Sequence, residues 1–106
     1  MHEDRRIIFS YEEAYKAIYS LCTQKEMKKP PPGAITSITA APEDDNKLKV
    51  RIDNMQDNSG RDIEYSRDFL AAALMLFCRS QSVPIPKKAN KSVELKTDGV
   101  ILRMTI

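Results

Sequence analysis

Residues 69–78 read FLAAALMLFC and form the longest apolar run of the chain. A run of this length suits either a strand or a buried helix, but alanine, leucine and methionine are strong helix formers and no residue in it is β-branched. Ser66 is a favourable N-cap, while Asp68 and Arg79 complement the helix dipole at the two ends. We therefore predict a helix that follows Ser66. The run is too short to cross a bilayer, which takes about 20 apolar residues.

Large apolar side chains point to more than one side of this predicted helix, so more than one neighbour has to cover it. A sheet supplies one neighbour, and the other is either a second helix of the chain or a second copy of the protein. If a partner supplies the cover, the candidate interface residues are Phe69, Met75 and Phe77. Exposed edge strands offer another docking mode, by strand addition.

A second helix is predicted nearer the N-terminus, where Ser10 and Glu13 form a capping box. Apolar residues recur at helical spacing as far as Cys22, and the segment Pro30-Pro31-Pro32-Gly33 prevents continuation. Residues that alternate, or that are rich in Ile, Val and Thr, predict the strands. These strands are residues 6–9, 34–41, 47–53, 62–65, 92–96 and 100–106, with Leu48, Val50, Ile52, Val100, Leu102 and Met104 facing inward.

The predicted order strand, helix, strand, strand occurs twice. Phe9-Ser10 precedes one helix and Tyr65-Ser66 the other, and Cys22 and Cys78 each follow the serine by the same spacing. We predict an α+β fold of two such halves, a pseudo-duplication, in one mixed sheet with both helices on one face. The alternative is a ferredoxin-like βαββαβ sandwich in which residues 62–65 are only a loop.

Composition and length predict one ordinary globular domain. The chain has 106 residues, of which 42% are hydrophobic and 30% charged, and its net charge is +2. We expect residues 1–4 to be a flexible N-terminus and residues 5–106 to form the domain. The N-terminal residues have no apolar signal core, so the expected location is cytoplasmic. Cys22 and Cys78 lie on apolar helical faces and are expected to be free, buried thiols.

The sequence offers little for catalysis or metal binding. His2 is the only histidine and lies at the terminus, so the usual Ser-His and Cys-His schemes lack a base. The acidic stretch from Asp53 to Glu64 fails as a calcium loop, because Met55 and Asn58 occupy positions that need an oxygen ligand and a glycine. The three glycines belong to no phosphate-binding motif. We therefore expect no catalytic residues, no metal and no cofactor, and a protein that is not an enzyme.

Two clusters of basic residues are the other candidate binding feature, and each follows a predicted helix. Cations favour helix C-termini for structural reasons, but related clusters at the ends of two related helices could also grip phosphates. The predicted strands carry almost no aromatic residues on which bases could stack. The candidate anion or nucleic-acid contacts are Lys25, Lys28, Lys29, Arg79, Lys87, Lys88 and Lys91.

Two functions remain open on these observations. The leading prediction is a small cytoplasmic, non-enzymatic binding or regulatory module that acts through protein–protein contacts, with a protein partner or as a homodimer. The alternative is a nucleic-acid-binding module that uses the two lysine clusters. Neither prediction involves a membrane.

Overall fold

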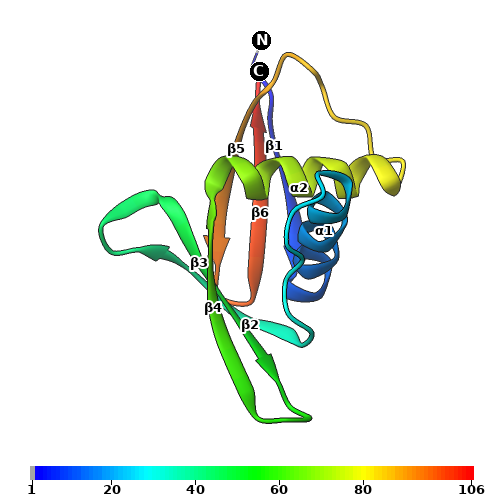
Figure 1. Ribbon diagram of the computed structural model, residues 1–106. Helices are drawn as coiled ribbons and strands as arrows, with labels where there is room; N and C mark the ends of the chain where they lie inside the picture. The colour runs from blue at the N-terminus through cyan, green and yellow to red at the C-terminus, as the bar shows by residue number, and fades with distance from the viewer. Residues whose placement is uncertain (1) are drawn as a thin grey trace.

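Within the residues that the structure describes, the fold consists of two helices and six strands arranged as two antiparallel sheets (Figure 1). The computed structural model describes residues 2–106. The predicted α+β class is confirmed. In chain order the elements are β1 (Asp4–Ser10), α1 (Tyr11–Gln24), β2 (Ala34–Ala41), β3 (Asp44–Asn54), β4 (Ser59–Ser66), α2 (Arg67–Ser80), β5 (Asn90–Lys96) and β6 (Gly99–Thr105).

The predicted single mixed sheet is wrong, because the strands divide into one sheet of order β1-β6-β5 and another of order β2-β3-β4. The first strand of each half of the chain pairs with the hairpin of the other half. Thus β1 pairs with β6, and β4 pairs with β3 over its whole length, from Lys47 opposite Ser66 to Asn54 opposite Ser59. With a full strand at β4, the ferredoxin-like alternative is wrong as well.

Both helices begin as their sequences predict. Ser10 Oγ accepts a hydrogen bond from the Glu13 amide at 3.1 Å, and Glu13 Oε1 accepts one from the Ser10 amide at 2.9 Å, which completes the capping box. Ser66 Oγ accepts a bond from the Phe69 amide at 3.0 Å. The strand before each helix therefore ends at a residue that also satisfies the first helical turn.

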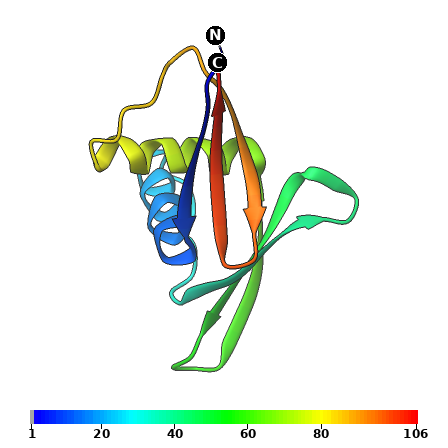
Figure 2. The same cartoon turned by 180° about the vertical axis from the view of Figure 1, so that it is seen from behind.

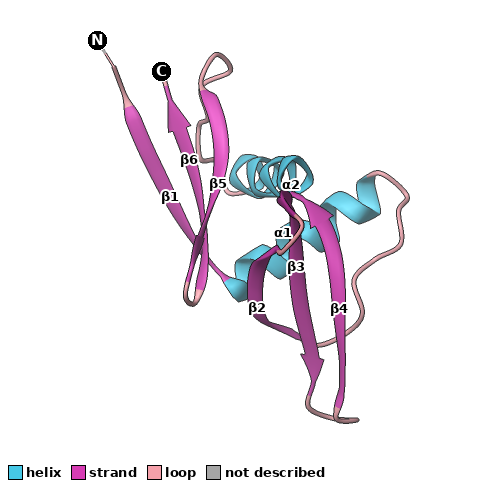
Figure 3. Cartoon of the chain, turned by 90° about the vertical axis from the view of Figure 1, so that its left-hand side faces the viewer, coloured by secondary structure: helices cyan, strands magenta, loops and turns pink. Residues whose placement is uncertain are grey.

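The helices pack on each other and on both sheets. Helix α1 contacts β1 and β6 as well as β2, while α2 contacts β5 as well as β3 and β4. Figures 1 and 2 show both helices on one face of the β1-β6-β5 sheet, and Figure 3 shows the β2-β3-β4 sheet standing apart from it. The two sheets share no strand, and the helix pair packs against both of them.

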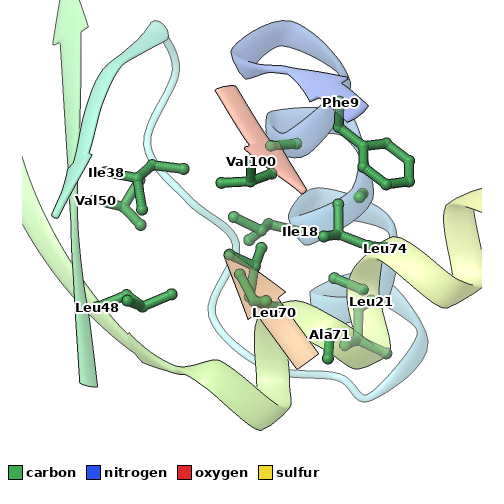
Figure 4. Close-up of a cluster of buried hydrophobic side chains, with 14 of the residues drawn as sticks. Phe9, Ile18, Leu21, Ile38, Leu48, Val50, Leu70, Ala71, Leu74 and Val100 are labelled. Atoms are coloured by element: carbon green, nitrogen blue, oxygen red, sulfur yellow. The ribbon is translucent and has the colours of Figure 1, made fainter. Parts of the chain in front are cut away.

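The core lies where the helices meet the inner faces of the sheets (Figure 4). Leu70 and Leu74 of α2 are fully buried among Ile18 of α1, Val50 of β3 and Val100 of β6. No polar or charged residue within residues 2–106 is buried. The six strand residues predicted to face inward are all buried, which confirms that prediction: Leu48, Val50, Ile52, Val100, Leu102 and Met104.

The start of β1 and the end of β6 lie together at one end of the β1-β6-β5 sheet (Figure 1). Glu3 and Ile106 exchange two backbone hydrogen bonds, of 3.3 and 2.9 Å, and Asp4 is already the first residue of β1. Of the predicted flexible segment 1–4, Met1 lies outside the described residues, and the flexibility of the others stays a prediction. In the described part of the chain, no helix has the length and apolarity needed to cross a membrane.

Candidate binding surfaces

The charged side chains of the described residues lie at the surface, and the two thiols do not. Cys22 and Cys78 are buried and free, as predicted, and burial raises the pKa of both thiols. Within residues 2–106, no group of three or more His, Cys, Asp or Glu side chains is placed to hold a metal ion. The candidate sites are therefore depressions, unpaired charges and exposed apolar side chains.

A depression at the end of α2, which we call the α2 depression, brings basic and apolar side chains together. Its volume is about 350 Å³. It joins Met75, one of the predicted interface residues, to three of the predicted anion contacts, Arg79, Lys87 and Lys91. Two features that the sequence suggested separately therefore lie in one site. The complete lining is Met75, Arg79, Val83, Pro84, Ile85, Pro86, Lys87 and Lys91.

The loop that forms one wall of the α2 depression is held in shape by its own contacts. The Val83 amide donates a hydrogen bond to the Cys78 carbonyl at 2.8 Å, which turns the chain sharply after the helix. Lys91 Nζ donates to the carbonyls of Lys87 at 3.3 Å and of Ala89 at 3.2 Å. The two prolines of the loop also restrict the backbone. The wall is therefore preorganised.

Within residues 2–106, no carboxylate forms an ion pair with a cation of the two predicted clusters. Among the described residues, ion pairs with carboxylates involve six other basic residues: Arg6, Lys16, Lys47, Arg51, Lys96 and Arg103. None of the seven predicted contacts is among them, and only Lys91 of the seven is partly buried. Their positive charge is therefore available to a ligand.

A second depression lies between the loop after α1 and strand β4, and we call it the α1 depression. Its volume is about 200 Å³, and it contains Lys28 and Lys29 of the first predicted cluster. Lys25 and Lys88 line neither depression. The α1 depression is lined by Lys28, Lys29, Pro31, Arg61, Asp62, Ile63 and Tyr65.

Two tyrosines of α1, Tyr15 and Tyr19, contact the loop that supplies Lys29 and Pro31 to the α1 depression. Lys29 Nζ lies 5.8 Å from the centre of the Tyr19 ring, and that ring stacks on Tyr15 with the ring centres 6.3 Å apart. Tyr15 Oη donates a hydrogen bond to the Pro31 carbonyl at 2.9 Å, which ties the loop to the helix. The sequence alone did not predict this gathering, since it depends on how the loop folds back.

Tyr65 joins the α1 depression to the core. Burial, followed by the neighbouring Cys22 thiol, raises the pKa of Tyr65 to about 12. Its ring stacks on Phe69 with the ring centres 5.0 Å apart and the planes 10° apart. Tyr65 therefore presents a neutral phenol at neutral pH, and its ring position is fixed.

The other predicted interface residues have partners inside the chain. Phe69 stacks on Tyr65, and Phe77 packs edge-on against Phe9 with the ring centres 6.1 Å apart. Both rings are half-buried against the core. Their role in an interface stays a prediction, and Met75 is the predicted interface residue that the structure brings together with the basic residues.

Comparisons with protein-family models, with curated proteins and with solved structures find no match for this chain. The function is therefore inferred from the two depressions and the surfaces around them.

Proposed function

We propose that this chain is a non-enzymatic binding or regulatory module that acts through protein–protein contacts at the α2 depression. One observation carries the proposal: an apolar lining that includes Met75 adjoins unpaired cations, Arg79 and Lys87, in the same preorganised site. A cytoplasmic location belongs to the proposal, and it is supported by the free, buried cysteines, which suit a reducing compartment.

The chemistry of the α2 depression selects the kind of partner. Arg79 and Lys87 favour carboxylates, with which they form charge-assisted hydrogen bonds. Met75 is flexible and polarizable and adapts to apolar side chains of various shapes. The partner that fits both is an acidic protein segment that also carries a large apolar side chain.

An amide-resolved NMR titration of the full chain tests this function. The probes are a short peptide of alternating Glu and Leu, the same peptide with Ser in place of Leu, and single- and double-stranded DNA of random sequence. We expect the leucine peptide to shift the amides of residues 75–91 in a saturable way and to bind about tenfold more tightly than the serine peptide, because it buries apolar surface.

Matched variants test whether the leucine peptide binds at the α2 depression. The double change Arg79→Gln and Lys87→Gln should weaken binding of the leucine peptide by about tenfold at low salt, whereas Lys16→Gln, an exposed lysine on α1, should leave it unchanged. Equal binding of the two peptides, or no saturable shift around the α2 depression, would contradict the proposed function.

A nucleic-acid-binding module is the second candidate, and the tyrosines beside Lys28 and Lys29 favour it. Binding to random DNA should then weaken steeply with salt, and it should weaken further when Lys28, Lys29, Lys87 and Lys88 are replaced. If DNA binds more tightly than the leucine peptide, the nucleic-acid-binding function replaces the protein-binding function. No binding of DNA at low salt would remove the second candidate.

Self-association is a further part of the proposal, with a second copy of the chain as the partner. Ile8 is 61% exposed and lies opposite Ile101 in the β1-β6 pairing, so a small apolar patch faces outward from that sheet. Sedimentation over a concentration series should show a dimer that dissociates on dilution. A monomer at concentrations on the order of tens of micromolar would remove the homodimer from the proposal.

We also propose that the two halves are a duplicated unit. In support, both helices end in the same way: Glu26 and Ser82 have φ angles of 56° and 59°, and the amide after each donates to the carbonyl of Cys22 or Cys78 at 2.8 Å. Superposing residues 4–54 on residues 59–105 should align the helices and the hairpins together. A superposition that aligns the helices but separates the hairpins would contradict the duplication.

A further inference from the structure

Arg61 occupies a position in β4 where the strand pattern calls for an apolar residue. On the inner side of the β3-β4 ladder, Tyr65 lies opposite Leu48, and Ile63 lies opposite Val50. The next position on that side pairs Arg61 with the buried Ile52. An exposed cation thus continues the face that packs on the core, and no carboxylate within the described residues forms an ion pair with it. A break of this kind in an otherwise consistent pattern marks a candidate functional position.

The loop after α1 brings two more cations to Arg61. Lys28 and Lys29 precede three consecutive prolines, of which Pro31 lines the α1 depression. Proline fixes the backbone, and the hydrogen bond from Tyr15 Oη holds the Pro31 carbonyl in place. Cations supplied by a stiff segment lose less conformational entropy when they bind a ligand than cations on a free loop.

The α1 depression is positively charged even though one carboxylate borders it. Asp62 has the opposite side-chain direction in the strand, and its Oδ1 lies 3.6 Å from Nη1 of Arg51, which belongs to β3. Three cations for which the described residues offer no ion-pair partner therefore surround the depression, together with one carboxylate that is already paired. The non-polar part of the lining comes from Pro31, Ile63 and the Tyr65 ring.

We infer that the α1 depression binds a phosphoryl group, carried by a small aromatic phosphate or by a phosphorylated side chain of a protein. The guanidinium of Arg61 presents a planar fork that matches two phosphate oxygens, while Lys28 and Lys29 supply compact charges for a dianion. The ring of Tyr65 offers an apolar wall for the group that carries the phosphate. This site is separate from the α2 depression and does not depend on the function proposed for it.

A titration of the full chain followed by amide NMR tests the inference. The probes are inorganic phosphate, phenyl phosphate, a phosphotyrosine peptide and, as a monoanionic aromatic control, benzoate. We expect phenyl phosphate to shift the amides of residues 28–31 and 61–65 in a saturable way and to bind about tenfold more tightly than benzoate, since it carries a second charge near neutral pH. Binding of phenyl phosphate should also weaken as the pH falls below about 6, where the phosphate loses that charge.

Two substitutions distinguish a specific phosphate-binding site from non-specific attraction to a positively charged surface. Arg61→Gln should weaken phenyl phosphate by about tenfold, while Lys49→Gln should have no effect, because Lys49 is an exposed cation in the other side-chain direction of β3, near Glu43 and Glu64. Thermal unfolding of each variant checks that the fold persists. A phosphotyrosine peptide that binds more tightly than phenyl phosphate would identify a protein as the source of the group, and the reverse order would identify a small phosphate.

Three results would overturn the inference. They are benzoate binding as tightly as phenyl phosphate, an equal loss of binding in the Arg61 and Lys49 variants, and shifts spread over all exposed lysines instead of the two named segments. The leucine peptide is expected to shift residues 75–91 instead, so failure at the α1 depression is distinguishable from failure of the proposed function.

Discussion

Arg67 is the side chain that ties the two sheets together. It is the first residue of α2, where a cation opposes the helix dipole. Its Nε donates to the Asp45 carbonyl of β3, and its Nη1 donates to the Val93 carbonyl of β5 at 2.6 Å. Hydrogen bonds from a charged donor to two strands of different sheets offset the unfavourable helix position.

Replacing Arg67 by methionine should therefore destabilise the fold. We expect Arg67→Met to lower the free energy of unfolding by about 1–3 kcal/mol, because it removes two charge-assisted bonds. Lys47→Met is the control, since the exposed pair of Lys47 with Glu64 contributes about 1 kcal/mol or less. Urea denaturation measures both, and equal losses in the two variants would contradict the bridging role of Arg67.

The raised pKa of Tyr65 predicts how the stability of the fold depends on pH. Burial raises the pKa of Tyr65 from 10.0 to about 12. Because this pKa is higher in the folded chain than in the unfolded chain, the stability linked to it is complete below pH 10 and is lost as the pH rises through 12. Absorbance of tyrosinate should show a late step near pH 12 in the folded protein, and Tyr65→Phe should remove it. If the step persists in that variant, Tyr65 is not the residue responsible.

At the scale of single residues, the sequence predicts interactions between residues that are close along the chain. The capping roles of Ser10, Glu13 and Ser66 follow from spacing along one helix, and the structure confirms them. The contacts of Arg67 and Arg61 depend on which strands lie side by side, so spacing alone cannot reveal them. Lys28 and Lys29 of the α1 depression were predicted as anion contacts, whereas for Arg61 the available signal was its alternation with Ile63 and Tyr65.

At the level of elements, the ends of the helices carry an unusual feature. Glu26 and Ser82 adopt the left-handed backbone conformation that usually falls to glycine after a helix. Residues with a Cβ are strained there. The strain is located in two short segments that lead directly into the loops of the two depressions.

Glycine at these positions should stabilise the chain. We expect Glu26→Gly and Ser82→Gly each to raise the free energy of unfolding by a few tenths to about 1 kcal/mol. Thermal or urea unfolding measures the change. Ser80→Gly, in the last turn of α2, is the matched control and should destabilise the protein by a similar amount. Destabilisation by Glu26→Gly would show that the left-handed conformation is not strained.

The kinds of element were predictable, and some of their boundaries were not. The helix predicted from residues 69–78 is α2, Arg67–Ser80, and its most buried residues, Leu70, Ala73 and Leu74, belong to the apolar run. The strand predicted at residues 47–53 begins earlier than expected, because β3 already starts at Asp44 beyond an irregularity in its pairing with β2. A polar composition favours a turn, but pairing with a neighbouring strand overrode that preference.

For the whole molecule, alternation predicted which side of a strand is buried but not which strands are neighbours. The inward residues of β3 and β6 are correct, yet these strands belong to different sheets. The first strand of each half pairs with the hairpin of the other half. This pairing joins segments that are far apart along the chain, so no local sequence pattern predicts it. For this reason the predicted α+β class is confirmed, whereas the predicted single mixed sheet is wrong.

The candidate site follows the same rule. The two basic clusters could be predicted from the sequence, but the depressions that they line could not. Each depression also includes residues that the fold of a loop brings next to the cluster. Met75 was predicted as an interface residue and Arg79 as an anion contact, and the structure places both in the α2 depression. The fold thus combines two separate sequence features into one candidate surface.

The preference of the α2 depression for an acidic segment with an apolar side chain is tested most directly by comparing the leucine and serine peptides on the wild-type chain and on Met75→Ser. We predict a preference for leucine of about tenfold in the wild type that falls to about twofold or less in the variant, because Met75 supplies the apolar contact. The same preference in both proteins, or none in the wild type, would contradict the proposed function.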